Sequence, residues 1–435
     1  SEQLANLSED IVWMEEKIVA GQKVLVPVVY LAKDYEYLKG ATITAKKGID
    51  LKIGNFTNTG TMKSGDYLKL DSKSITNNQG IILANGKASL ISNDDFVNKN
   101  GGLIKASEVQ IASINGNIIN QTFAQTNKIQ QGSNDFTHTL LGKQSNIQSI
   151  NGNLILQAKN NIDNIGSKLE ASKTLSLTTQ IGDINLKTLS LENGHNVNYS
   201  GGFNKALDVE HLKATASAGE NVIMNSGNNI NLEASKLNAI NQINLNAQND
   251  VNITAVNDVN YKDVQTSSKG FMSKKTQRDM SYKEEVNSAE LNAKDIVINA
   301  KNDVNLEASK LKAQDNIVVF AKDGDVNVLA KTYKEGELHQ TSKSSWGGLK
   351  KSLDIKSNDV LKLNSALLET QAANVVLTSG KDINILASEI SSGNLLLAHA
   401  KRDLNILSDE EILKQEEIHK KTSFSPSISG NMLVL

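Results

Sequence analysis

The sequence predicts an all-β protein, a right-handed parallel β-helix solenoid with about 20–22 residues per coil and with extruded β-hairpins. Three observations predict it. Short segments alternate apolar and polar residues, which is typical of strands. Equivalent strands start 21 residues apart, for example at Leu154 and Leu175 and again at Val222 and Ile243. Helical spacing is nearly absent. A coil of this length suits strands that stack on their equivalents at roughly 4.8 Å.

The alternation also predicts which side chains face the core. Ile, Val and Leu are expected to point inward, with Ala where the coil narrows, and Asn, Lys, Glu and Thr are expected outward. No coil buries its apolar face alone, so stacked neighbours supply the stability. We expect about 16 coils and a rod of roughly 75 Å. Right-handed winding follows from the rule for parallel crossovers.

A longer period is superimposed on the coils. The phrase DVNLEASKLKA at 303–313 repeats NINLEASKLNA at 229–239, and a looser copy starts at Asp382. Polar, Lys-rich segments interrupt the coils at a similar spacing, with Thr-Ser pairs at Thr266, Thr341 and Thr422. We interpret these interruptions as hairpins, and one repeat as about three coils plus one hairpin. In the phrase itself, Val304 and Leu306 are expected to point inward, with a bend at Ala308 and Ser309.

The domain organisation follows from these periods and from the irregular stretches between them. The expected parts are a linker helix and capping β-hairpin at 1–32, N-terminal coils at 33–119, coils with irregular insertions at 120–211, regular coils at 212–407 with hairpins at 257–286 and 331–352, and a partial third hairpin at 408–435. Because no leader or apolar run of membrane-spanning length is present, we expect the chain to be part of a longer one.

Composition argues against several kinds of site. The chain has no Cys, which excludes disulfides and thiolate chemistry, and its net charge is −2. Arg occurs only at Arg278 and Arg402, which argues against nucleic acid as a partner. The six His show no metal-ligand spacing, so neither a metal nor a cofactor is expected. Regularly placed Asp residues suggest a carboxylate cleft or a Ca²⁺ ladder, or more simply turn residues that bond to the backbone; these are Asp183, Asp250, Asp303, Asp325, Asp382 and Asp403.

Candidate interaction residues lie in the hairpins. Each hairpin is rich in Lys, Ser and Gly and carries one aromatic residue, which indicates either a plain solvated loop or a docking face. The candidates are Phe271, Lys274, Lys275, Trp346, Lys350 and Lys351. A separate set, Trp13, Pro27 and Tyr30, lies in an N-terminal hairpin with strands at about 10–19 and 23–31. Its expected role is to cap the first coil.

The N-terminal segment SEQLANLSEDIVWMEEKIVAGQKVLVPVVYLA carries a family resemblance. The matching residues include Glu2, Gln3 and Asp10–Trp13 in its first half and Val24–Pro27 with Tyr30 in its second. It resembles the segment that precedes the second haemagglutinin repeat region in filamentous-haemagglutinin-like two-partner secretion exoproteins. The coils at Asn58, Asn78 and Asn100, and the SKLxA series, resemble that region too. The segments 120–147 and 190–211 follow the pattern poorly.

The resemblance implies a function. Such regions belong to contact-dependent growth inhibition toxins and related adhesins, which implies a secreted, cell-surface protein held in the periplasm before release. It also implies an outer-membrane transporter, a C-terminal toxin domain, and a target cell's outer membrane or receptor as partners. Two interpretations stay open: a non-catalytic delivery segment for the toxin, or an adhesin shaft. A β-helix enzyme is a distant third. Exposed strand edges at the rod ends further predict end-to-end self-association.

Overall fold

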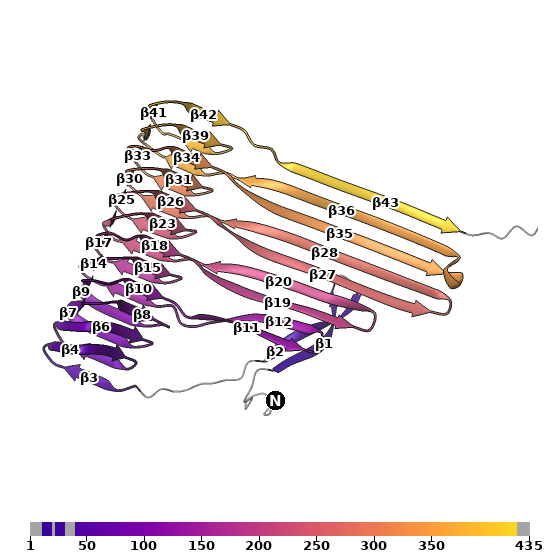
Figure 1. Ribbon diagram of the computed structural model, residues 1–435, viewed down its shortest axis with the longest axis horizontal. Coiled ribbons are helices and arrows are strands. Elements are labelled where there is room, and N and C mark those ends of the chain that lie inside the picture. The colour runs from indigo at the N-terminus through magenta and orange to yellow at the C-terminus, as the bar shows by residue number, and fades with distance from the viewer. Residues whose placement is uncertain (1–10, 20–21, 31–39, 424–435) are drawn as a thin grey trace, which may run out of the picture.

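The computed structural model describes residues 11–19, 22–30 and 40–423, and almost all of it is β-structure. Its main body is a parallel β-helix, a rod in which every strand pairs with its equivalents in the coils before and after it (Figure 1). Twelve coils can be followed through the described residues. One face of the rod is built from β3 (Thr42–Ala45), β5 (Thr61–Ser64), β7 (Ile81–Ser92), β9 (Leu103–Ser113), β13 (Asn146–Ser149), β16 (Lys168–Ala171), β21 (Thr215–Ala218), β24 (Lys236–Ala239), β29 (Glu290–Ala293), β32 (Lys310–Ala313), β37 (Leu367–Thr370) and β40 (Glu389–Ser391).

The other two faces follow the same order, and the long strands β7 and β9 bend into the second one. The second face adds β4 (Ile49–Asn58), β6 (Leu68–Asn78), β14 (Leu154–Ala158), β17 (Leu175–Thr179), β22 (Asn221–Ser226), β25 (Gln242–Ala247), β30 (Asp295–Ala300), β33 (Ile317–Ala321), β38 (Val375–Ser379) and β41 (Leu396–Ala400). The third face takes the second halves of β4 and β6, then β8 (Phe96–Lys99), β10 (Ile118–Gln121), β15 (Ile162–Ile165), β18 (Ile184–Lys187), β23 (Ile230–Glu233), β26 (Val251–Thr254), β31 (Val304–Glu307), β34 (Val326–Leu329), β39 (Ile383–Leu386) and β42 (Leu404–Leu407).

The core is a stack of aliphatic columns that runs the length of the rod. Val304 and Leu306 are fully buried, as the alternation predicted, and they align with Val326 and Val328 in the next coil. In the first coils, a column of Asn residues departs from the expectation that Asn side chains point outward. Asn58, Asn77, Asn98, Asn120 and Asn164 point inward, and each side-chain amide donates to the next at 2.7–2.8 Å. Inward Asn is tolerated here because the stacked amides satisfy one another.

From the fourth coil onward, hairpins leave the rod at one corner, between the third face and the first, at every second coil. They are β11–β12 (Ala124–Gln131, Asn134–Leu141), β19–β20 (Leu189–Tyr199, Gly202–Leu212), β27–β28 (Val256–Gly270, Ser273–Asn287) and β35–β36 (Lys331–Ser345, Lys350–Asn364), followed by the single strand β43 (Ile412–Ser423). The alternate coils turn instead through a residue with positive φ followed by Ser. The positive-φ residues are Gly166, Ala234, Ala308 and Ala387.

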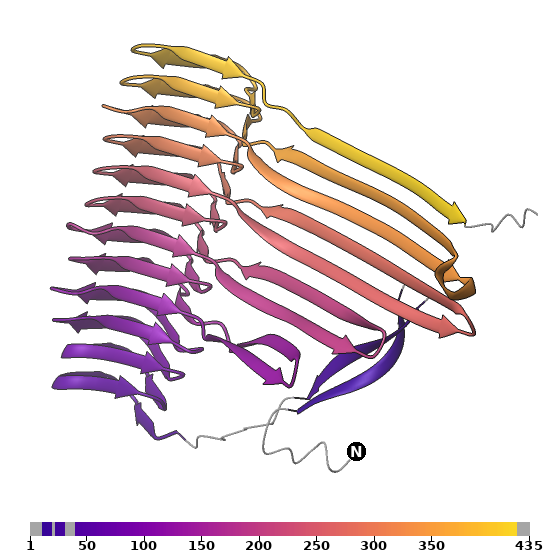
Figure 2. The same cartoon turned by 45° about the vertical axis from the view of Figure 1, so that its right-hand side comes forward.

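The nine hairpin strands pair edge to edge into one antiparallel sheet, which stands off the rod (Figure 2). The spacing explains this sheet. Two coils rise by two interstrand spacings, and one hairpin adds two strands at the same spacing, so successive hairpins meet in register. A repeat is therefore two coils plus one hairpin, and the expected three coils were wrong.

Three other expectations need correction. The rod has twelve coils in its described part, roughly 55 Å at the usual strand spacing, and not 16, because the hairpins take more residues than expected. The stretch at 120–211 is not irregular, since it contains two hairpins of the same sheet. The second hairpin does not end at 352, because β36 continues to Asn364.

The N-terminal hairpin pairs β1 (Ile11–Val19) with β2 (Gln22–Tyr30). Strand β2 contacts β19, β20 and β27, and the Asn204 side chain donates to the Leu25 carbonyl at 3.0 Å. These contacts place the hairpin against the antiparallel sheet, whereas the sequence predicted a cap over the first coil. The side chains of Trp13, Pro27 and Tyr30, and the linker helix expected before this hairpin, lie outside the described residues.

Candidate functional site

The outer edge of the antiparallel sheet is the candidate site, and we call it the rim. It comprises 266–277 around the β27–β28 turn, 341–353 around the β35–β36 turn, and the end of β43 at 420–423. The first turn has two residues, Phe271 and Met272, between the paired Gly270 and Ser273. The second is a short 3₁₀ turn, Trp346–Gly348, in which Gly347 and Gly348 have φ of 64° and 99°. Such values favour glycine.

Apolar side chains occupy the extreme tips of these turns. Phe271 is 95% exposed and Trp346 is 65% exposed, and Met272 and Leu349 beside them are also exposed. The two tips adjoin, because Ser273 pairs with Ser345 across the hairpin junction, and the Met272 side chain lies beside Gly347. The two turns therefore lie side by side at the end of the sheet that is remote from the rod (Figures 1 and 2).

Lysines lie directly behind the apolar tips. The rim contains eight of them and no Asp or Glu, although the whole chain has a net charge of −2. They are Lys269, Lys274, Lys275, Lys343, Lys350, Lys351, Lys420 and Lys421. In the described part of the chain, none of the eight forms an ion pair with a carboxylate.

The register even brings lysines opposite one another. Lys269 pairs with Lys274 within one hairpin, and Lys275 pairs with Lys343 across the junction to the next. Like charges directly opposed across strands destabilise a sheet. The rim thus carries a concentrated positive charge that the protein itself does not neutralise.

All six residues predicted from the sequence lie on this rim: Phe271, Lys274, Lys275, Trp346, Lys350 and Lys351. The structure brings the two predicted clusters together, which the sequence spacing alone did not show. It adds Met272, Leu349, Lys269, Lys343, Lys420 and Lys421. The position of Thr422, opposite Lys351, could have pointed to Lys420 and Lys421 had hairpin pairing been foreseen.

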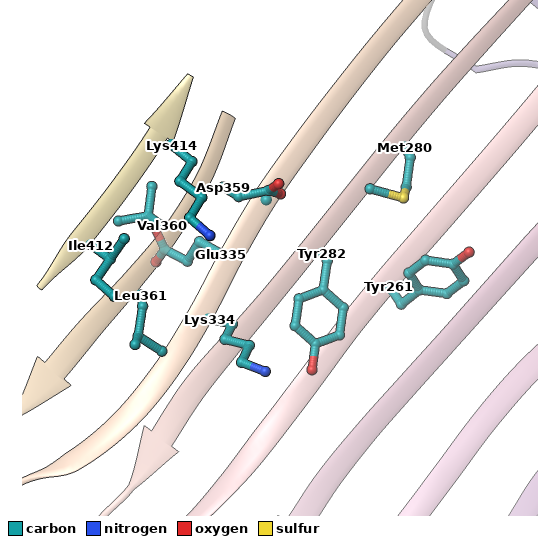
Figure 3. Close-up of a pocket in the computed structure, with 11 residues that line it drawn as sticks. Tyr261, Met280, Tyr282, Lys334, Glu335, Asp359, Val360, Leu361, Ile412 and Lys414 are labelled. Atoms are coloured by element: carbon teal, nitrogen blue, oxygen red, sulfur yellow. The ribbon is translucent and has the colours of Figure 1, made fainter. Parts of the chain in front are cut away.

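A shallow groove of about 500 Å³ crosses the middle of the same sheet (Figure 3). Gly336 forms its floor, because it lies opposite Tyr282 and has no side chain to fill the space. Tyr261 and Tyr282 lie edge to face along one wall, with their ring centroids 6.4 Å apart. Burial, and then the hydrogen bond to Glu284, raise the pKa of Tyr282 to about 12. This phenol therefore stays protonated near neutral pH and supplies no general base.

One buried ion pair braces the hairpin beneath the rim. Arg278 on β28 donates from Nε and one Nη to the two carboxylate oxygens of Asp263 at 2.9 and 2.8 Å, and Tyr261 donates to the same group. Asp263 is 2% exposed. The hydrogen bond to Asp263 raises the pKa of Arg278 further. One of the two arginines is thus committed to the fold of the hairpin.

The regular Asp residues of the rod form a ladder and not a cleft. Asp250 Oδ1 accepts the backbone N–H of Asp303, Asp303 accepts that of Asp325, and Asp325 accepts that of Asp382, at 2.8–3.0 Å. They were expected to bond their own turns, and they bond the next coil instead. Among the described residues, no group of three or more His, Asp or Glu is arranged to hold a metal ion. No described helix is long and apolar enough to cross a bilayer.

A family model described as a hemagglutinin repeat matches residues 183–271 and 354–424. The first match runs from β18 through β27 and the second from β36 to β43. Each therefore contains two coils between arms of successive hairpins, which is the structural repeat described above.

Curated relatives give a consistent result. The tRNA nuclease CdiA of Yersinia mollaretii is 31% identical over 247 residues, 54% of this chain and 8% of that protein. Toxin CdiA of Yersinia pestis is 28% identical over 225 residues, 50% of this chain and 7% of the relative. The 16S rRNA endonuclease CdiA of Enterobacter cloacae is 32% identical over 173 residues, 39% and 5% respectively.

This chain therefore spans less than a tenth of the relatives that it matches, and no solved structure matches it. The match to the hemagglutinin repeat, the CdiA relatives and the coil-and-hairpin fold agree with one another. The chain is similar to the haemagglutinin repeats of CdiA proteins, and these findings support a segment of a filamentous-haemagglutinin-like two-partner secretion exoprotein of the contact-dependent growth inhibition family.

Proposed function

We propose that this segment is a non-catalytic structural part of a large secreted exoprotein and helps to deliver a C-terminal toxin across the outer membrane of a neighbouring bacterium. The observation that carries the proposal is the rim. The rod, through its lateral nine-stranded sheet, holds a row of apolar and cationic side chains away from its own body, as a docking edge requires. Relatives named as toxins and nucleases support a toxin elsewhere in the full-length chain.

The proposal includes the setting that the family implies. An outer-membrane transporter exports the chain, part of which waits in the periplasm, and contact with a target releases this segment onto the target surface. The competing function is an adhesin shaft whose exposed rim attaches the cell to a host or bacterial surface. The same rim favours it, because attachment needs an exposed edge equally.

Deleting hairpins from the full-length exoprotein separates the two functions. Removing 256–288 joins Ala255 to Ala289, and removing 331–365 joins Ala330 to Ala366. Both junctions restore the two-residue corner found in the alternate coils, so the rod can continue. Under the delivery function, killing of target cells falls while cell attachment persists. Loss of attachment with killing intact would make this segment an adhesin shaft.

A further inference from the structure

The rim combines two kinds of side chain in a fixed order. Phe271, Met272, Trp346 and Leu349 lie at the tips, and the eight lysines lie within about five residues behind them. Strand residues rise about 3.3 Å each, so Lys269, Lys274 and Lys275 sit roughly 7–13 Å behind the first tip. An apolar end with a cationic collar at that distance matches the boundary between acyl chains and phosphates in a lipid leaflet.

We propose that the rim docks edge-on onto a phosphate-bearing lipid surface. Phe271 and Trp346 enter the acyl-chain boundary, and the lysines contact lipid phosphates. This deepens the proposed function by naming the partner of the rim. It is tested on this chain alone, so that a failure of toxin delivery and a failure of lipid docking give different results.

Charge complementarity favours this partner. The rim presents eight lysines and no carboxylate, and its register places Lys269 opposite Lys274 and Lys275 opposite Lys343, so an anionic surface complements its charge and relieves the repulsion within these pairs. Nucleic acid fits less well. The rim has no Arg, Arg278 behind it is held by Asp263, and the outermost atoms are apolar.

The location of the surface is specific to the last two hairpins. The β11–β12 turn at 132–133 is Gly-Ser and the β19–β20 turn at 200–201 is Ser-Gly, and neither has a large apolar residue. Among the hairpin turns that the structure describes, only those at Phe271 and Trp346 therefore reach into lipid. The β43 end adds Lys420 and Lys421 to the cationic collar beside Lys350 and Lys351.

The test measures partition of the chain onto vesicles of phosphatidylcholine mixed with phosphatidylglycerol, against vesicles of phosphatidylcholine alone. A Trp13→Phe background leaves Trp346 as the reporter, because the chain has two Trp. We expect binding to the anionic vesicles with a blue shift of Trp346 emission, and a loss of binding as salt rises. Lys274→Gln with Lys275→Gln should weaken the partition about 25-fold, roughly fivefold per lysine.

Matched controls address folding and nonspecific charge. Lys301→Gln with Lys322→Gln removes the same charge from exposed positions on the rod, and binding should not change. Lys274→Gln and Lys275→Gln also remove two repulsive pairs, so the thermal midpoint should hold or rise while binding falls. Phe271→Ser should weaken binding without changing its salt dependence.

Three results would overturn the proposal. Equal binding to neutral and anionic vesicles would show that the lysines do not contribute to binding. Equal weakening of binding by Lys301→Gln with Lys322→Gln would show that binding depends on the net charge of the chain and not on the rim. Binding to a soluble polyanion such as heparin, with none to the anionic vesicles, would assign the rim to a different class of partner.

Discussion

The imidazole Nδ1 of His419 lies 2.9 Å from Oδ1 of Asp354, across the line where β43 joins the β35–β36 hairpin. Each of the other junctions between hairpins carries a similar contact. These are His138 with Asn193, His211 with Asp258, and His339 with Asp279, at 2.7–2.9 Å. Four of the six His thus lie where separate hairpins meet, although their sequence spacing gave no sign of a shared role.

The junction at β43 should respond to pH. Hydrogen bonds to Asp354 and then to Glu417 raise the pKa of His419 above 6.5, and bonds to Lys356 and then His419 lower the pKa of Glu417 below 4.5. A raised His pKa adds stability that is complete below 6.5 and is lost as pH rises through the folded value. A lowered Glu pKa adds stability that is lost as pH falls through the folded value, below 4.5. Hydrogen exchange of β43 amides, corrected for intrinsic rates, should show most protection between these limits.

His419→Gln should reduce the loss of β43 amide protection that occurs as pH rises above 6.5. His399→Gln, on β41 in the rod, is the matched control and should leave it intact. Protection that does not weaken above pH 6.5 in the unmodified chain would show that the His419–Asp354 pair does not hold β43.

The Arg278–Asp263 ion pair of the β27–β28 hairpin should contribute more to the free energy of unfolding than the exposed Arg402–Asp382 pair. Arg278→Met leaves the Asp263 carboxylate buried without its cation, and we expect a loss of about 2–3 kcal/mol. This is below the usual cost for a fully buried pair because the Arg278 side chain is 35% exposed. Arg402 makes the same bidentate contact with Asp382 at an exposed position, so Arg402→Met should have little effect. Urea unfolding followed by Trp346 emission in the Trp13→Phe background measures both.

Adding Asp263→Asn to Arg278→Met removes the stranded charge and should recover part of the lost stability. A cost for Arg278→Met that equals that of Arg402→Met would indicate that the Asp263 carboxylate is hydrated in solution.

Substitution in the middle of the inward Asn column should destabilise the protein. Asn98→Ala removes the acceptor of the Asn77 amide and the donor to Asn120 Oδ1, all within the core. Each buried polar group left without a partner costs about 1–3 kcal/mol, so we expect a loss of roughly 2–4 kcal/mol. Asn305→Ala, in the partly exposed outward ladder, should cost under about 1 kcal/mol. Similar denaturation midpoints for the two variants would contradict this difference.

Ala308 should tolerate glycine although it is fully buried. Its φ of 43° strains an L-residue by about 1–2 kcal/mol, which offsets the methyl group and chain entropy lost in Ala308→Gly. Gly166 occupies the equivalent corner, which supports the exchange. Ala300→Gly, at a buried strand position, should instead cost about 1–2 kcal/mol. Thermal melts of the two variants that shift equally would show that the corner of Ala308 is not strained.

The coils were predictable from the sequence because their determinants are local. Alternation set which face of each strand is buried, and the 21-residue beat set the stacking partner, as Leu154 and Leu175 show. The antiparallel sheet was not predictable in this way. Its pairings, such as Ser273 with Ser345, join residues far apart in sequence and are fixed by the rise of the intervening coils. The first two hairpins lack the Thr-Ser pair that marks the later ones, so the sequence does not identify their segments as hairpins.

The repeat of two coils plus one hairpin leads to a specific prediction about this fold. Deleting 309–330 removes the coil of β32–β34 and joins Ala308 to Lys331, the same dipeptide that leads into β35 in the intact chain. The rod can close, but only one coil then separates the two hairpins. That coil rises by about 4.8 Å where two strands need about 9.6 Å, so β28 and β35 cannot pair as they do now. We expect the rim hairpins to become sensitive to limited proteolysis.

Deleting 288–364 is the matched control, because it removes two coils and one hairpin together. Asn287 is then followed by Ser365, which reproduces the Asn-Ser-Ala sequence found at both sites. The spacing between the remaining hairpin and β43 is kept, so β28 can pair with β43. This larger deletion should leave the sheet resistant to protease while the smaller one does not. If the smaller deletion is the more resistant, hairpin pairing is set by side chains such as His339 and Asp279 and not by the rise of the coils.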